Sequence, residues 1–264
     1  MSKTTFIIMV TNGRGGVAKT NLTYSLATIL GNAGFKTVAL DCDVSETLKR
    51  KIDKRRRWIA HGENDVVDPP FDFNTCVFKT EIKLQRNGIR KLLADRIASY
   101  DVAVLDISGE FSSVQTSLAP VVDYIAMPIK PEETMLDSTL ESYILIQQTL
   151  EDEPDLKEED RPKISLAKVM WNKTRNITKE CEKILDDEKD SYTYRTLKTL
   201  LRTFESPYGR ADYYGVSIVE ADKCGDKGER KAAEKPAYEM TRLCKEILMD
   251  AGLVDAKMKK IERN

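Results

Sequence analysis

The chain has 264 residues, and its 42 basic and 43 acidic side chains give a formal net charge of −1 at pH 7. This length suits one α/β domain, and the balanced charge means that any basic surface for a polyanion must be local. Five cysteines without CxxC spacing argue against a disulfide framework or a zinc site, so a metal ion would be held by oxygen. We expect a single cytoplasmic domain over residues 1–264, without a signal peptide or a membrane-spanning run.

Short apolar runs alternate with longer amphipathic segments along the chain. The expected strands cover residues 5–10, 36–40, 102–107, 124–128 and 164–171, and the expected helices cover residues 20–33, 88–99, 138–150 and 236–251. Fully apolar strands that alternate with helices indicate a mostly parallel β-sheet with helices on both faces. Ligands of such sheets bind beyond the carboxyl ends of the strands.

Three charged segments lie outside this alternation. Residues 151–160 form an acidic connector that contains proline, and residues 177–202 are expected to form a long charged helical insertion. Residues 49–58, "KRKIDKRRRW", are strongly basic. This basic segment can neutralise phosphates and Trp58 can stack on a base, although a solvated basic helix explains the same residues.

The segment "TNGRGGVAKTN", residues 11–21, connects the first strand to the first helix. Glycines in such a loop let backbone N–H groups turn towards an anion, a lysine meets phosphate oxygens, and a hydroxyl ligates Mg²⁺. Gly13, Gly15, Gly16, Lys19 and Thr20 supply these parts. The order of these residues between a strand and a helix favours a phosphate-binding loop over a plain tight turn.

The loop resembles the deviant Walker A motif KGGxGKT of the ParA/MinD group of ATPases. Further segments resemble the same group in the same order: "VALDCDVS", "YDVAVLDISG", "VVDYIAMPIKPEE", "VMWNKTRN" and "YYGVSIVE". Together they cover roughly residues 3–220, and residues 45–85 and 175–205 match poorly. The resemblance implies a P-loop NTPase-like α/β fold that binds ATP or ADP with Mg²⁺ and hydrolyses ATP slowly.

The resemblance also implies roles for single residues. The nucleotide would be bound by the loop and by an asparagine that reads adenine: Gly13, Arg14, Gly15, Gly16, Val17, Ala18, Lys19, Thr20, Asn21 and Asn172. Mg²⁺ would lie at Thr20, Asp41 and Asp106, while Lys19 neutralises the phosphates and Asp43 orients the attacking water. Each of these residues also has an alternative role without a nucleotide. Asp41 and Asp43 could cap a helix or form a turn, and Asp106 could be a buried charge paired with another residue. Asn172 could be a turn residue.

Three departures from the family pattern bear on activity. Family members use a lysine at position 14 to reach the nucleotide of a partner subunit; Arg14 keeps the charge and adds a bidentate fork, with an exposed loop arginine as the alternative. Ala18 replaces a glycine expected to have positive φ, which costs about 1–2 kcal/mol, or about one decade of affinity. "DVS" stands where the family has Asp-Pro-Gln. Hydrolysis is therefore a weaker expectation than binding.

By resemblance to short ParA-like plasmid partition ATPases without an N-terminal helix-turn-helix, the chain would be an ATP-dependent dimerisation switch in DNA partitioning. Its partners would be a second copy around ATP, non-specific DNA and a ParB-like or other adaptor or centromere-binding protein, which would associate the chain with the nucleoid. The tail "DAKMKKIERN" lacks bulky aromatic residues, so we expect no membrane partner. The alternative is a weakly or non-hydrolysing nucleotide-binding adaptor in plasmid maintenance or conjugative transfer.

Overall fold

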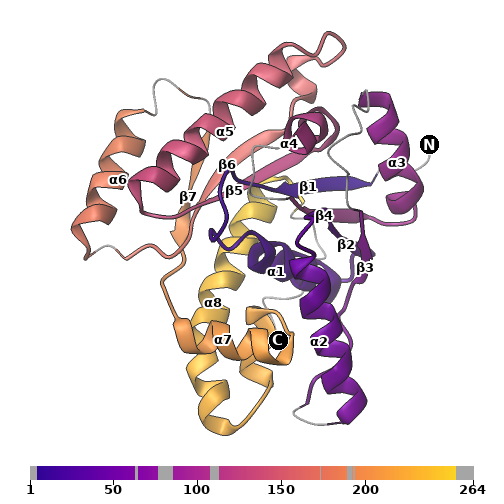
Figure 1. Cartoon of the computed structure of the whole chain (residues 1–264), viewed down its shortest axis with the longest axis vertical. Coiled ribbons are helices and arrows are strands. Elements are labelled where there is room, and N and C mark those ends of the chain that lie inside the picture. Colours follow the sequence, from indigo (N-terminus) through magenta and orange to yellow (C-terminus); the bar gives the residue numbers. More distant parts are fainter. Residues whose placement is uncertain are drawn as a thin grey trace.

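The computed structural model of the chain describes residues 5–62, 65–76, 86–107, 113–172, 174–188, 192 and 194–253. One sheet runs through its centre (Figure 1). The strands are β1 (Phe6–Val10), β2 (Thr37–Asp41), β3 (Asp72–Thr75), β4 (Val102–Asp106), β5 (Tyr124–Ile129), β6 (Lys163–Lys168) and β7 (Arg195–Leu200). They pair in the order β3-β2-β4-β1-β5-β6-β7, and every pair is parallel.

Helices cover both faces of this sheet, as the apolar strands require. One face packs against α1 (Lys19–Asn32), α2 (Thr47–His61), α7 (Glu205–Tyr214), the 3₁₀ turn η3 (Ile218–Lys223) and α8 (Lys227–Asp250). The other face packs against α3 (Arg86–Ile97), α4 (Ser113–Leu118), α5 (Glu133–Glu151) and α6 (Asn176–Asp187). The chain also forms the 3₁₀ turns η1 (Ala119–Val121) and η2 (Glu158–Asp160). The expected parallel α/β fold is confirmed, with a core on each side of the sheet.

Two strands were missed, and one expected helix is wrong over part of its length. Residues 177–202 do not form one helical insertion, because α6 ends at Asp187 and β7 follows. Among the described strands, β7 is an edge strand that pairs only with β6; the side chain of Lys198 is exposed, and that of Arg195 is largely exposed but reaches Asp250 of α8. β3, at the opposite edge, has only four residues with no buried side chain. Such edge strands lack the continuous apolar run on which the expectation depended.

The last helix begins at Lys227, earlier than the expected residue 236, and contains Pro236 in its interior. A capping box explains the earlier start, because Glu229 N donates to Asp226 Oδ1 at 2.9 Å and Asp226 N donates to Glu229 Oε2 at 3.1 Å. The far end is anchored by the buried Asp250, whose Oδ2 accepts from Tyr124 Oη at 2.9 Å and from Ser165 Oγ at 2.5 Å. α8 is therefore held at both ends.

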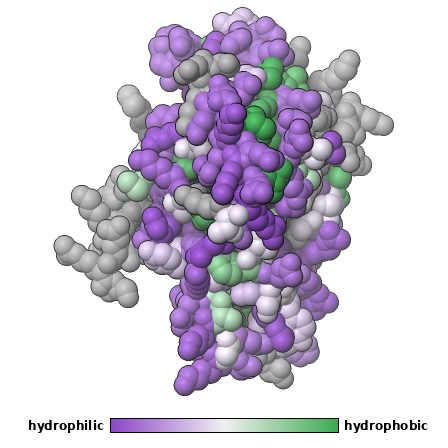
Figure 2. Space-filling view, turned by 90° about the vertical axis from the view of Figure 1, so that its left-hand side faces the viewer, coloured by the Kyte–Doolittle hydropathy of each residue, from purple (hydrophilic) through white to green (hydrophobic). Residues whose placement is uncertain are grey.

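Most of the surface on the side of α6 and β7 is hydrophilic, with a narrow apolar strip in the upper half of the view (Figure 2). Among the described residues, no helix combines the length and the apolar character that crossing a membrane requires.

Candidate nucleotide-binding site

The loop between β1 and α1 has the backbone of an anion-binding turn. Gly16 and Ala18 both have positive φ, 75° and 61°, and α1 begins directly after Ala18. No side chain caps this N-terminus, so the first N–H groups of α1 are available to an anion, which the helix dipole also favours. Gly15 and Gly16 are exposed, whereas Val17 is buried in the core.

Gly13 serves packing as well as the turn. A Cβ on Gly13 would lie 2.3 Å from Ser142 Oγ and 2.9 Å from the Ser138 carbonyl oxygen, both on α5. Only glycine lets the loop approach α5 this closely. Asn12, which the sequence analysis did not single out, completes this contact: its Nδ2 donates to Pro128 O and to Thr139 Oγ1, both at 2.7 Å.

Lys19 is buried at the start of α1, with 7% of its surface exposed. Its Nζ donates to the carbonyl oxygen of Arg14 at 2.7 Å, so the lysine closes the loop on itself. Burial lowers the pKa of Lys19, while the negative charges of Asp106 and Asp43 act in the opposite direction. An anion bound in the loop would stabilise the charged ammonium that burial disfavours.

Asp106 ends β4 level with Val10 of β1 and Asp41 of β2, and it is 1% exposed. It forms no ion pair with a described residue, and its Oδ2 has no hydrogen-bond partner among them. Burial raises its pKa to about 7, although a hydrogen bond from Thr20 and the charge of Lys19 oppose the shift. A buried carboxylate oxygen without a partner, beside a threonine hydroxyl, is a donor set that fits Mg²⁺.

Asp41 and Asp43 follow on β2 and make local contacts. The buried Asp41 accepts from Lys49 N at 2.9 Å and from Asp43 N at 3.2 Å, so its carboxylate holds the first turn of α2. Burial raises the pKa of Asp41. Asp43 is half-buried and accepts from Ser45 N at 2.8 Å. These are the contacts of the capping and turn alternatives, and Asp41 and Asp43 still lie close enough to Asp106 to raise its pKa.

Arg14 is exposed, and its guanidinium forms no hydrogen bond or ion pair with a described residue. Its backbone is fixed, since Arg14 N donates to Asn12 Oδ1 at 3.0 Å and Arg14 O accepts from Lys19. The side chain is thus presented from a fixed backbone. Whether it serves a second copy stays a prediction.

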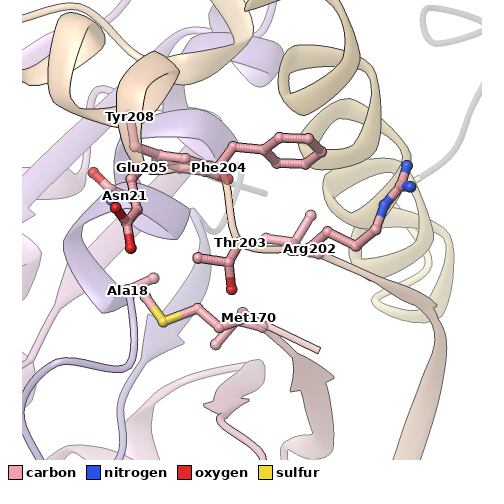
Figure 3. Close-up of a pocket in the computed structure, with 10 residues that line it drawn as sticks. Ala18, Asn21, Met170, Arg202, Thr203, Phe204, Glu205 and Tyr208 are labelled. Carbon is pink, nitrogen blue, oxygen red and sulfur yellow. The ribbon is translucent and has the colours of Figure 1, made fainter. Parts of the chain in front are cut away.

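An apolar cavity of about 150 Å³ adjoins the loop. It is lined by Ala18, Asn21, Val169, Met170, Leu201, Arg202, Thr203, Phe204, Glu205 and Tyr208. Figure 3 shows the thioether of Met170 reaching the methyl group of Ala18 on the floor of this cavity. Asn21 lies above Ala18 on the same side of the cavity, near Glu205 (Figure 3). A flat apolar base fits such a cavity beside a phosphate-binding loop.

Asn172 does not line this cavity. Its Oδ1 accepts from Thr174 N at 3.1 Å and from Thr174 Oγ1 at 2.8 Å, which is the Asx-turn arrangement of the turn alternative. The residue two positions earlier, Met170, has positive φ (56°) and does line the cavity. Sequence reasoning missed Met170, Phe204 and Tyr208 because they come from distant parts of the chain: the loop after β6, the loop after β7 and α7.

The basic segment of α2 is largely engaged within the fold. Arg55, 1% exposed, donates to both oxygens of Glu220 at 2.8 and 3.0 Å. Lys51 and Lys54 both pair with Asp212, at 2.5 and 3.0 Å. Trp58 Nε1 donates to Tyr213 O, and its ring packs on the rings of Tyr213 and Tyr214. Much of the basic segment, for which phosphate contact and a solvated helix were both open, therefore attaches α2 to α7 and η3.

Residues 8–215 match the family described as the CobQ/CobB/MinD/ParA nucleotide binding domain. The chain belongs to this family. It is 26% identical over 140 residues to an uncharacterized ATP-binding protein of Methanocaldococcus jannaschii, and the match covers 48% of this chain. The chain spans about half the length of that relative, 53%.

Solved structures of ParA and MinD proteins share the fold. ParA of pNOB8 has a TM-score of 0.66 at 14% identity, covering 95% of this chain and 99% of that one. MinD of Pyrococcus horikoshii with Mg-ADP has a TM-score of 0.61 at 16% identity, covering 95% and 98%. A Borrelia burgdorferi B31 protein assigned to plasmid partition, bound to AMPPNP, has a TM-score of 0.62 at 16% identity, covering 91% and 98%. At these identities the likeness shows the ParA/MinD-type fold.

Ala18→Gly should stabilise the folded chain. Ala18 has a left-handed backbone in the folded chain, with φ 61°, so the strain at this position lowers the stability of the fold. Relief of about 1–2 kcal/mol, less the greater freedom of glycine in the unfolded chain, leaves about 0.5–1 kcal/mol. Thermal unfolding should show a rise in Tm of about 1–4 °C. Ala232→Gly, in the right-handed exposed part of α8, is the control and should lower Tm. An unchanged or lower Tm for Ala18→Gly would contradict this account of the loop.

Asp106→Asn should change how stability depends on pH. Burial raises the pKa of Asp106 in the folded chain from 3.8 to about 7, so between these values the folded state binds a proton that the unfolded state has lost. The contribution of Asp106 to the free energy of unfolding is therefore complete below pH 4 and is lost as the pH rises through 7. The free energy of unfolding of the wild type, relative to the variant, should fall by at most about 1.4 kcal/mol per pH unit between pH 4 and 7. Urea unfolding of both proteins without Mg²⁺ measures this difference. Parallel pH profiles would show that Asp106 is not buried as described.

Proposed function

We propose that the chain is a ParA-like ATPase that binds Mg-ATP at the loop of residues 13–21 and uses it as an ATP-dependent dimerisation switch in DNA partitioning. The observation that carries this proposal is the joint burial of Lys19 and Asp106 at the end of the central strands. Within the described part of the chain, Lys19 bonds to a single backbone carbonyl and one oxygen of Asp106 has no hydrogen-bond partner. A triphosphate with its metal ion supplies what each lacks.

Each residue of the site has its own role in the proposed phosphoryl transfer. Backbone N–H groups of the loop and the start of α1 hold the phosphates, and Lys19 neutralises their charge. Thr20 and Asp106 would hold Mg²⁺, which supplies charge neutralisation when bound, and Asp41 supports it from the neighbouring strand. Asp43 orients water, and the cavity next to Ala18 and Met170 takes the base.

The proposed dimer, the DNA and the adaptor partner are suggested by related proteins. The guanidinium of Arg14 is exposed and bonds to none of the described residues, and it is the group that would reach the nucleotide of a second copy. One related structure is of pNOB8 ParA bound to nonspecific DNA and another is a MinC:MinD complex of Aquifex aeolicus. We propose non-specific DNA and a ParB-like or other adaptor as partners, and a cytoplasmic, nucleoid-associated location.

Lys19→Ala tests the proposal. Loss of a buried charge-assisted contact should weaken Mg-ATP binding by roughly 10- to 100-fold in calorimetry. Lys49→Ala is the matched control, since the ammonium of Lys49 pairs with Glu46 outside the loop and its removal should leave the affinity unchanged. If the wild type does not bind Mg-ATP at millimolar nucleotide, the proposal is wrong.

Phosphate release on the same samples, with and without DNA, separates the two candidate functions. Slow release that Lys19→Ala abolishes supports the partition ATPase. Tight Mg-ATP binding with no release identifies the non-hydrolysing adaptor, which the missing proline and glutamine after Asp43 make the relevant alternative.

A further inference from the structure

One face of α8 presents a line of cations that the sequence analysis did not single out. Five cations and one tyrosine lie three or four residues apart and therefore share one side of the helix: Lys227, Lys231, Lys235, Tyr238, Arg242 and Lys245. We call these residues the α8 cationic face. The first three and Arg242 are exposed, Lys245 is half-buried, and Tyr238 is 62% exposed. None of the five cations forms a hydrogen bond or an ion pair with a described residue.

The acidic side chains of α8 are mostly bound elsewhere. Glu246 accepts from the backbone N–H groups of Lys198 and Thr199, both at 2.7 Å. Glu239 accepts from Arg202 N and Nε, and Glu229 pairs with Arg210 at 3.0 Å. Glu234 is the acid that stays exposed beside the cations. The tertiary contacts thus separate the charges of α8, which the sequence alone shows as mixed.

The opposite side of α8 is fixed in the core. Met240, Leu243, Cys244, Ile247 and Leu248 are fully buried there. A helix that lies on a membrane needs its apolar side for the lipid, and this side is already occupied. Figure 1 shows α8 as one long helix along the body of the molecule. From Lys227 to Lys245 its cations span about 27 Å, at a rise of about 1.5 Å per residue.

We propose that the α8 cationic face, and not the basic segment of α2, binds the phosphate backbone of duplex DNA. This inference rests on the proposed function, of which DNA binding is a part. A straight row of unpaired cations suits a linear polyanion, because one turn of B-DNA is about 34 Å long and carries its charge evenly along that length. The guanidinium of Arg242 lies over the ring of Tyr238, with its Cζ 5.9 Å from the ring centroid.

The test compares two triple variants that each remove three charges. Lys231→Gln, Lys235→Gln and Arg242→Gln alter the α8 cationic face, and Arg50→Gln, Arg56→Gln and Arg57→Gln alter the exposed cations of α2. Binding of a fluorescent duplex of arbitrary sequence is measured with Mg-ATP over a range of salt concentrations. The α8 variant should bind at least about tenfold more weakly, and its slope of log K against log salt should shrink by about 3.

The α2 variant should retain wild-type DNA affinity and slope. Mg-ATP calorimetry should give wild-type affinity for both variants, which shows that the site is intact. An α2 variant that loses DNA while the α8 variant keeps it overturns the inference but leaves the proposed function standing. A wild type that binds Mg-ATP and no DNA removes both the inference and the DNA part of the proposed function. A wild type that binds poly-L-glutamate more tightly than the duplex at equal charge concentration would mark a surface for acidic protein and overturn the inference.

Discussion

The register of three neighbouring strands is the constraint on which the site depends. Asp106 on β4 lies level with Val10 on β1 and with Asp41 on β2, so the three strands end at the same edge. The loop that follows β1 therefore delivers Lys19 beside Asp106, and the turn that follows β2 delivers Asp43 close to both. A shift of one residue in either pairing would turn Asp106 to the opposite face of the sheet.

Burial then shifts the pKa values of Lys19 and Asp106. In water, Lys19 would keep its proton and Asp106 would lose its own, but the shared buried edge lowers the pKa of Lys19 and raises that of Asp106 to about 7. The fold thus holds two ionisable groups that the described residues compensate only in part. Strain at Ala18 and the open carboxylate oxygen of Asp106 are both costs to the folded protein, which a ligand at this edge would offset.

The sequence was informative where a residue's role is local. Apolar runs predicted β1, β2, β4, β5 and β6, and the glycine pattern predicted the loop, while the resemblance to the ParA/MinD group implied the positive φ found at Ala18. The sequence did not predict features that form where segments distant in the chain contact one another. The charged edge strand β7 has no continuous apolar run, and the cavity joins α1 to loops after β6 and β7. Likewise the basic segment of α2 looked exposed until Glu220 and Asp212 supplied its partners.

The central claim is that the edge next to Lys19 and Asp106 is a Mg-nucleotide site. A crystal structure of the full chain with Mg²⁺ and a non-hydrolysable ATP analogue tests it most directly. The account predicts that Lys19 Nζ leaves the carbonyl of Arg14 for a phosphate oxygen, that the metal ion lies at Thr20 and Asp106, and that Arg14 points to the nucleotide of a second copy. A nucleotide bound elsewhere, with Lys19 still bonded to Arg14, would contradict it.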